Sequence, residues 1–287
     1  MNPKHLFIDG SNYLFRSYFG VPQAANYKGM KVNAVYGFFA ILRRIAKEVV
    51  PQTITVVFDS QTGIAQKIEE RPEYKATREL PDTGMYVQLP FIKRILERCR
   101  IEWIEPPHHE ADDVIGSLAR VAAEHGGTAY VSSNDFDFAQ LIAPRIILVR
   151  DIRGKAIFIS EEDFKREWRM EPSQYVDYLS IKGDSSDNVA GISGIGPKTA
   201  SDLVQQYGSI EGIVKNLENI PTRQRGMIQS QQKELLSNKK FLQIDTSIDV
   251  SIFNGSEQHL GFLAHELFEV TSNQHLETID NENRSPV

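Results

Sequence analysis

The sequence predicts an α/β fold built on a mostly parallel sheet, and two patterns lead to this prediction. Three short apolar runs, at residues 5–8, 53–58 and 128–131, have the length and composition of buried strands. Segments with apolar residues at helical spacing lie between or beside them, at residues 35–50 and 111–125. Strands that alternate with helices are typical of a parallel sheet covered by helices.

Two regions depart from this alternation. Residues 61–100 form an insertion that is rich in charge and interrupted by prolines. From Pro172 onward the pattern is helical and punctuated by glycine, with residues 250–252 as a candidate strand. We therefore expect a core domain at residues 1–170 that carries the insertion, a helical module at residues 171–252, and a C-terminal segment at residues 253–287 with one helix near residues 260–268 and an acidic end.

Composition excludes several classes of protein. The 287 residues contain no apolar run near the roughly 20 residues that span a bilayer, and the N-terminus reaches a turn before any run could serve as a signal peptide. Cys99 is the only cysteine, so no intrachain disulfide can form, as suits a reducing compartment. We expect a cytoplasmic protein without a membrane partner.

The net charge of −6 does not exclude a nucleic-acid partner, because the charge is unevenly distributed. Residues 254–287 hold six acids and one base, and thus most of the negative charge. Nine further acids belong to the candidate cation ligands described next. Without those nine, residues 1–253 would carry a charge of +8, which is compatible with binding DNA.

Acids follow each of the predicted strands. Asp9 ends the first run, Asp59 ends the second, and Asp135 and Asp137 come shortly after the third. Ligands gather at the carboxyl ends of the strands in an open parallel sheet. We therefore expect these four side chains to lie along one edge.

Two further groups of acids have the spacing of ligands. Glu110 and Asp113, at the start of the helix at residues 111–125, share one helical face, and Asp112 is offset by one position toward a neighbouring site. Asp184 and Asp187 repeat the three-residue spacing. So many carboxylates share a pocket only if cations neutralise them, and oxygen ligands without a Cys or His cluster select Mg²⁺ or Mn²⁺. Two such ions, about 4 Å apart, are the usual apparatus for hydrolysis of a phosphodiester.

Each acid taken alone also has a structural explanation. A single aspartate after a strand can be a helix N-cap or a turn residue. Asp112 and Asp113 could be first-turn acids favoured by the helix dipole, and Glu110 a capping partner. The metal interpretation rests on the convergence of separate segments at one predicted edge.

A glycine-rich turn precedes a predicted helix in the second half of the chain. Gly191, Gly194 and Gly196 let the backbone approach a phosphate, Pro197 suits the first helical position, and Lys198 adds charge. Such a hairpin would bind the backbone of one DNA strand without reading its bases. An ordinary turn between helices remains the alternative.

The insertion contains basic residues that could contact a phosphate. Lys75 and Arg78 share a helical face, with Tyr74 beside them. The two cations could stabilise the charge of a transition-state phosphate, and Tyr74 could stack on a base. A charged surface exposed to solvent is the alternative that composition alone favours.

Taken together, these segments resemble the 5′-nuclease family, which comprises the N-terminal domain of bacterial DNA polymerase I, phage 5′-nucleases and free-standing bacterial exonucleases and flap endonucleases. The resemblance extends from about Leu6 to Ile252. Its markers include Phe7-Ile8-Asp9-Gly10, Val56-Val57-Phe58-Asp59, Glu73-Tyr74-Lys75, Glu110-Ala111-Asp112-Asp113, Ser133-Asn134-Asp135-Phe136-Asp137, Gly183-Asp184-Ser185-Ser186-Asp187-Asn188 and the glycine hairpin.

The resemblance implies a nuclease core similar to PIN-type nucleases, an arch formed by residues 61–100 for a 5′ single strand, and a helix–turn–helix DNA-binding module. It also implies a structure-specific 5′-nuclease that cuts 5′-flap, nicked or branched DNA in replication and repair, as a free-standing and monomeric enzyme. No polymerase segment follows the nuclease segment in this sequence.

The resemblance assigns roles to individual residues. The first ion would be held by Asp9, Glu110, Asp112, Asp113 and Asp135, with Asp59 positioning the cluster, and the second by Asp137, Asp184 and Asp187. Lys75 and Arg78 match residues that contact the scissile phosphate, Arg16 matches a basic position near the active site, and the backbone around residues 191–196 could hold K⁺. Phe136 and Ala190 depart from the family pattern, which commonly has lysine and proline there.

Three other functions fit parts of this pattern. A non-catalytic protein that binds DNA junctions could have the same fold without metals. A PIN-type ribonuclease would lack the hairpin module. A Mg²⁺ phosphatase would need an acid two positions after Asp9, where Ser11 stands.

Overall fold

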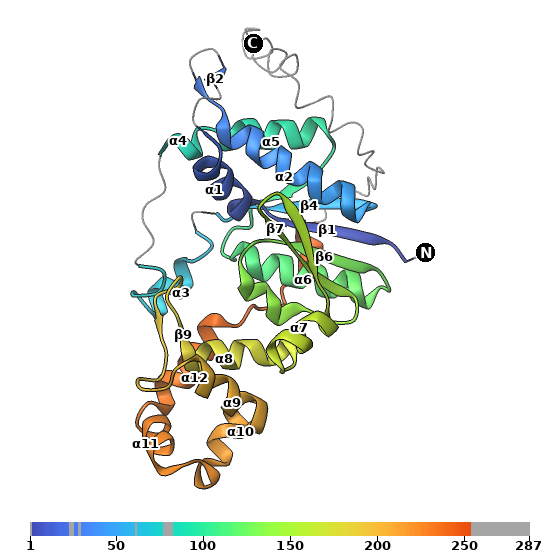
Figure 1. Cartoon of the computed structure of the whole chain (residues 1–287). Helices are drawn as coiled ribbons and strands as arrows, with labels where there is room; N and C mark the ends of the chain where they lie inside the picture. The colour runs from blue at the N-terminus through green and yellow to red at the C-terminus, as the bar shows by residue number, and fades with distance from the viewer. Residues whose placement is uncertain (1, 23–25, 28–29, 61, 77–82, 254–287) are drawn as a thin grey trace.

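The computed structural model describes residues 2–22, 26–27, 30–60, 62–76 and 83–253, and its centre is a six-stranded sheet (Figure 1). The strand order is β5-β4-β1-β6-β7-β8, in which β8 is antiparallel to β7 and the other neighbours are parallel. This confirms the predicted α/β fold. The strands are β1 Lys4–Asp9, β4 Thr53–Val57, β5 Glu102–Ile104, β6 Thr128–Ser132, β7 Ile146–Ile152 and β8 Lys155–Ile159.

Helices cover both faces of the sheet. On one face lie α1 (Gly10–Gly20), α2 (Asn33–Val49) and α5 (Leu89–Arg98), and on the other lies α6 (Ala111–Glu124). Strand β1 serves both layers, because successive side chains point to opposite faces. Leu6 and Ile8 pack with the first layer, and Phe7 packs with α6.

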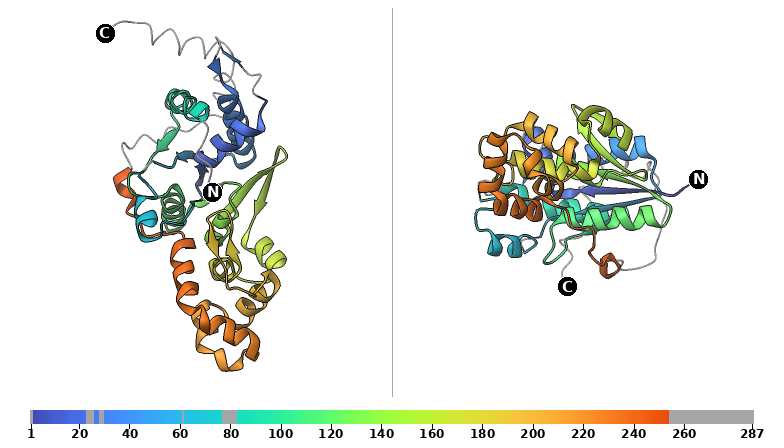
Figure 2. Two further views of the ribbon diagram at one scale, coloured as in Figure 1. Left: turned by 90° about the vertical axis from the view of Figure 1, so that its left-hand side faces the viewer. Right: turned by 90° about the horizontal axis from the view of Figure 1, so that it is seen from below.

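A helical module projects from the sheet domain, away from α1, α2 and α5 (Figure 2). The hydrophobic core on the α6 side continues from Phe7 into this module as far as Ile248, so the two parts share one core. The helices of this half are α7 Glu161–Trp168, α8 Tyr175–Lys182, α9 Pro197–Tyr207, α10 Ile210–Lys215, α11 Thr222–Ser230 and α12 Gln232–Leu242.

Short elements complete the described chain. They are β2 Asn26–Tyr27, β3 Met30–Lys31, α3 Ala65–Glu70, α4 Thr83–Tyr86, β9 Gly183–Asp184, β10 Val189–Ala190 and the 3₁₀ helices η1 Phe136–Leu141, η2 Pro172–Gln174, η3 Leu217–Asn219 and η4 Val250–Phe253. Within the described residues, no helix has both the length and the apolar character needed to cross a membrane. The helix predicted near residues 260–268 and the acidic end lie outside the described residues.

The strand predicted at residues 250–252 is wrong, because this segment forms the 3₁₀ helix η4. The carboxylate of Asp249 accepts hydrogen bonds from the backbone N–H of Ser251 at 3.0 Å and from its hydroxyl at 2.6 Å. Such local bonds stabilise a turn in place of an extended backbone.

Asn238, fully buried on α12, joins the insertion to the helical module. Its Nδ2 donates to the carbonyl oxygens of Ser180 (3.1 Å) and Ala190 (2.7 Å), and its Oδ1 accepts from Arg71 Nη1 at 3.0 Å. One amide thereby satisfies polar groups on three segments that are distant in the sequence, two of them buried.

Replacement of Asn238 by alanine is expected to lower the free energy of unfolding by about 3 kcal/mol, because it leaves buried polar groups without partners. Urea denaturation followed by circular dichroism measures this change. Asn219→Ala, which removes only an exposed contact to Asn216 at 3.5 Å, serves as the control and should cost less than about 0.5 kcal/mol. Equal midpoints for the two variants would contradict the role of Asn238.

Candidate active site

Asp9 ends β1 at the carboxyl edge of the sheet and is held there by two hydrogen bonds. As the N-cap of α1, its Oδ1 accepts from the backbone N–H of Asn12 at 2.9 Å. Its Oδ2 accepts from the hydroxyl of Ser133 at 2.7 Å. The N-cap interpretation is therefore correct for Asp9, and it leaves the buried carboxylate facing the loop that follows β6.

Asp59, just after β4, connects the strand edge to the start of α6. Its Oδ1 accepts from the backbone N–H of Ala111 at 3.1 Å, and its own N–H donates to Ser11 Oγ at 2.8 Å. The side chain is otherwise exposed. This contact brings the N-terminus of α6, and with it Asp112, to the end of β4.

Asp135 and Asp137 follow β6 in a tight arrangement. Asp135 is the N-cap of η1 and accepts from the backbone N–H of Asp137 at 3.0 Å. The N–H of Asp135 donates to Ser133 Oγ at 3.0 Å, and the same hydroxyl donates to Asp9. Ser133 therefore fixes the position of the β6 loop relative to the end of β1.

The acids at this edge interact electrostatically in two groups that share Asp135. Burial and then the charge of Asp59 raise the pKa of Asp9, and burial followed by Asp9 raises the pKa of Asp112. Burial, then the charges of Asp135, Asp184 and Asp187, raises the pKa of Asp137. The two groups are Asp9, Asp59, Asp112 and Asp135, and Asp135, Asp137, Asp184 and Asp187.

The pKa values of Asp112, Asp135 and Asp137 are raised because burial and the neighbouring acids outweigh the charge of Lys75. Buried acids that repel one another in this way fit hard divalent cations, whose charge would restore the ionised form. Among the described residues, however, no three His, Cys, Asp or Glu side chains are arranged to hold a metal ion as they stand. The structure thus gathers seven of the nine predicted ligands at one edge, without the close approach of a formed ion site.

Glu110 and Asp113 lie against two lysines, and the hydroxyl of Tyr74 connects Glu110 to Asp187 of the second acid group. Glu110 is buried and forms ion pairs with Lys75 and with Lys67, whose Nζ lies 2.7 Å from its Oε1. Burial favours the neutral acid, but Lys75 and Lys67 outweigh it and lower the pKa of Glu110. Asp113 accepts from the backbone N–H of Asp245 at 2.8 Å and lies 3.8 Å from Lys67 Nζ. The structure therefore does not bring these two predicted ligands to Asp9.

Tyr74 and Lys75 lie in the interior, which contradicts two sequence interpretations. Tyr74 is 2% exposed, and its hydroxyl donates to Asp187 Oδ2 at 3.0 Å, so its ring offers no face to a base and the predicted stacking role is wrong for this structure. Lys75 is 9% exposed, which excludes the interpretation as a solvated surface charge. Its backbone N–H donates to the carbonyl oxygen of Asp187 at 2.9 Å, so the insertion is fastened to the segment of the second acid group.

The glycine hairpin has the predicted form. A β carbon on Gly191 would lie 2.3 Å from the carbonyl of Lys182, and Gly194 has φ of +86°, so both positions require glycine. Gly196 is the N-cap of α9 and Pro197 its first residue, with Lys198 exposed in the first turn. This is the geometry of a helix N-terminus available to an anion.

Arg16 is paired with Asp151, which is not one of the predicted ligands. Arg16 Nη2 donates to the carbonyl oxygen of Asp151 at 2.8 Å and lies 3.6 Å from its carboxylate, where Arg44 also forms an ion pair. Arg78 lies outside the described residues.

Two family models cover residues 4–258. Residues 4–169 match the 5′-3′ exonuclease N-terminal resolvase-like domain, and residues 170–258 match the 5′-3′ exonuclease C-terminal SAM fold. The chain belongs to the 5′-3′ exonuclease family. The family resemblance seen in the sequence is thereby confirmed.

Relatives of this 5′-3′ exonuclease family member are similar over most of its length. A 5′-3′ exonuclease of Aquifex aeolicus is 35% identical over 250 residues, which cover 87% of this chain and 84% of that protein. DNA polymerase I of Bacillus caldotenax is 32% identical over 269 residues, which cover 90% of this chain and 30% of the polymerase.

Solved structures share the fold of this family member. The T5 5′-exonuclease with bound zinc has a TM-score of 0.69 at 18% identity, covering 94% of this chain and 100% of that one. A complex of the bacteriophage T5 flap endonuclease with DNA and metal ions has a TM-score of 0.68 at 19% identity, covering 93% and 98%. At this level of identity the likeness establishes the fold.

The sequence patterns do not identify every residue that shapes the site of this exonuclease family member. Lys67 pairs with Glu110, and Ser133 links Asp9 to Asp135. Asn134 Nδ2 donates to the carbonyl oxygen of Asp151 at 2.8 Å and so holds the β6 loop against β7. Lys75 follows Lys67 by eight residues, about two helical turns. This spacing could have indicated that both lysines face the same side.

Proposed function

We propose that the chain is a metal-dependent, structure-specific 5′-nuclease that hydrolyses phosphodiester bonds in 5′-flap, nicked or branched DNA. The observation that carries this proposal is the gathering of acids from separate segments at the carboxyl edge of the sheet, with pKa values raised by burial and by one another. A role in replication and repair, a monomeric state and a cytoplasmic location are parts of the same proposal.

Two divalent ions, Mg²⁺ or Mn²⁺, fit the chemistry of this donor set, which consists of carboxylate oxygens. Asp9, Asp59, Asp112 and Asp135 would hold one, and Asp135, Asp137, Asp184 and Asp187 the other. When bound, such ions supply a nucleophilic hydroxide and stabilise charge on the attacking and leaving oxygens. Glu110 and Asp113, now paired with lysines, would join the first set after a change of partner.

The chain's own residues have distinct tasks in this proposal. Lys75 and Arg78 would stabilise negative charge on the phosphate that is cut, and Arg16 would support that end of the site. The first turn of α9, with Lys198, would bind a phosphate farther along the strand. Carbonyl oxygens of residues 191–196 would provide a site for K⁺.

A labelled 5′-flap duplex, incubated with and without Mg²⁺, tests the proposal. We expect cleavage near the base of the flap with Mg²⁺ and none with EDTA. Binding without cleavage under any divalent ion would support the non-catalytic junction-binding alternative. Faster cleavage of an RNA flap than of a DNA flap would support the ribonuclease alternative.

A further inference from the structure

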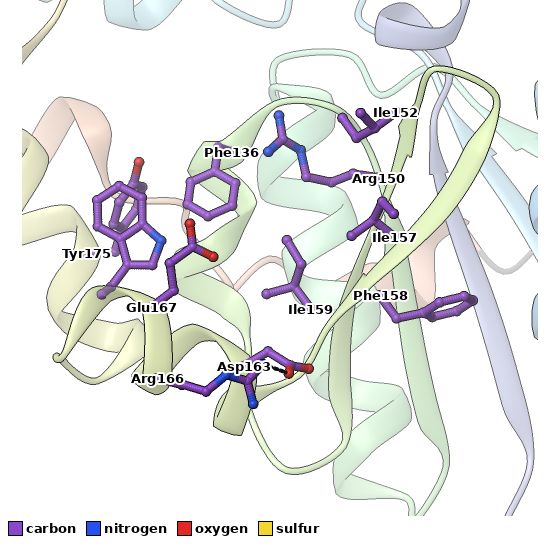
Figure 3. A pocket seen from close by; sticks show the side chains of 11 residues that line it. Phe136, Arg150, Ile152, Ile157, Phe158, Ile159, Asp163, Arg166, Glu167 and Tyr175 are labelled. Atoms are coloured by element: carbon purple, nitrogen blue, oxygen red, sulfur yellow. Dashed lines mark hydrogen bonds and ion pairs between the residues drawn. The ribbon is translucent and has the colours of Figure 1, made fainter.

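A cavity of about 490 Å³ lies beside the carboxylate edge, between the β7–β8 hairpin, η1, α7 and the start of α8 (Figure 3). This volume is within the range of small-ligand sites, roughly 300–1,000 Å³. None of the residues assigned above to the metals or to the scissile phosphate lines it. The cavity therefore has no role in the function proposed so far.

Flat aromatic side chains form one wall of the cavity. Phe136, from η1, stacks on Trp168 with ring centroids 5.5 Å apart and an angle of 28° between the planes. The ring of Tyr175 meets Phe136 edge-on at 5.3 Å. Arg150 reaches from β7 toward Phe136, with its guanidinium carbon 5.0 Å from the ring centroid (Figure 3). Such a wall suits a planar ligand.

Two residues of this wall carry buried N–H donors without a hydrogen-bond acceptor. Across the described residues, four buried side-chain polar atoms lack a hydrogen-bond partner, and two of them, Arg150 Nε and Trp168 Nε1, belong to residues that line this cavity. Arg150 is oriented by a hydrogen bond from Nη2 to the carbonyl oxygen of Asn134 at 3.1 Å. Buried donors are normally satisfied, so a planar ligand that carries acceptors fits both the wall and the donors.

The 3₁₀ helix η1 connects the cavity to the carboxylate edge along the chain. Phe136 stands between Asp135 and Asp137 in the chain. Tyr175, whose ring contacts Phe136, begins α8, which packs against η1. A nucleotide whose phosphate lies at these acids would have its base within reach of the Phe136 wall.

We propose that this cavity binds one nucleobase of the substrate strand, next to the phosphate that is cut. The base stacks against the wall of Phe136 and Trp168. Arg150 Nε and Trp168 Nε1, which are covered in the free protein, turn toward it and donate to one of its oxygen or ring-nitrogen acceptors. Every base has an aromatic face and acceptors, so the site fixes position without selecting sequence. The inference rests on the proposed function, since it takes a DNA strand as the ligand.

The two tryptophans of the chain allow a direct binding test. In a Trp103→Phe protein, Trp168 is the remaining tryptophan, and flap DNA added in Ca²⁺ is expected to change its fluorescence. An abasic residue is then moved one nucleotide at a time across the cut site. At a single position, loss of the base should remove the fluorescence change and weaken binding roughly five- to hundredfold, the range for loss of one stacked base.

Trp168→Phe tests the donor, because it keeps an aromatic ring and removes the N–H. We expect roughly three- to tenfold weaker binding of the intact flap, as for loss of one hydrogen bond, and a smaller added penalty from the abasic residue. Trp103→Phe is the matched control, since the indole of Trp103 donates to Glu97 at 3.2 Å outside the cavity. Arg150→Lys, which retains the charge but lacks Nε, should behave as Trp168→Phe does.

Equal affinity for every abasic substrate, or unchanged Trp168 fluorescence, overturns the inference. If the wild-type protein cuts flaps in Mg²⁺ and the abasic scan is flat, the base site fails and the nuclease proposal stands. If no flap is cut under any divalent ion, the nuclease proposal fails. The fluorescence titration with DNA in Ca²⁺ still decides whether the cavity takes a base.

Discussion

Replacement of Asp135 by asparagine is expected to lower the single-turnover rate of Mg²⁺-dependent flap cleavage by about a thousandfold or more. Asp135 is the one carboxylate that belongs to both electrostatic groups, so its charge would be shared by both ions. The asparagine oxygen can still accept from the backbone N–H of Asp137, and the local cap should survive. The substitution thus removes charge with little change of shape.

Quenched-flow cleavage of a labelled flap measures this rate, and binding in Ca²⁺ shows that the substrate still associates. Asp249→Asn provides the control, because Asp249 accepts from the backbone N–H of Ser251 in the same way but at an exposed position just before η4. Asp112→Asn should lose activity as Asp135→Asn does. Turnover at the wild-type rate in the Asp135 variant would remove this residue from the ligand set.

The strands that carry the acids can be predicted from the sequence, whereas the two outermost strands of the sheet cannot. Strands β1, β4 and β6 lie in the buried middle of the sheet, and each is a short, largely apolar run that ends at an aspartate or within three residues of one. Strand β5 has three residues, and β8 is an edge strand with mostly exposed side chains, so neither has the pattern of a buried strand. The sequence patterns therefore predict neither the β7–β8 hairpin nor the aromatic cavity that it helps to form.

The candidate ligands can be listed from the sequence, but their partners cannot. Spacing along α6 correctly separates Asp112 from the face shared by Glu110 and Asp113. Nothing local shows that this face meets two lysines from a segment about 40 residues earlier. The sequence indicates surface positions for Tyr74 and Lys75 for the same reason. Their burial against the acids results from tertiary packing, which no local pattern shows.

Removal of the Lys75 charge, as in Lys75→Met, is expected to slow the chemical step by on the order of 10²–10³-fold, the loss typical of one transition-state charge contact. Methionine keeps the apolar stem that packs in the interior, and Lys67 still pairs with Glu110. Binding of flap DNA in Ca²⁺ should change little, because the contact strengthens as charge develops on the phosphate. Single-turnover rates at saturating enzyme measure the effect.

Lys67→Met is the matched control for this prediction. Lys67 and Lys75 both pair with Glu110, so each substitution leaves that acid with one lysine. Lys67 also faces Asp113, whereas Lys75 lies 4.0 Å from Asp187 in the second acid group. If Lys75 acts on the phosphate from that position, its loss should slow the chemical step far more than the loss of Lys67. We therefore expect less than a tenfold loss of rate in Lys67→Met. Equal losses in the two variants would show that Lys75 acts only through the contacts that it shares with Lys67, those to Glu110 and to the ring of Tyr74.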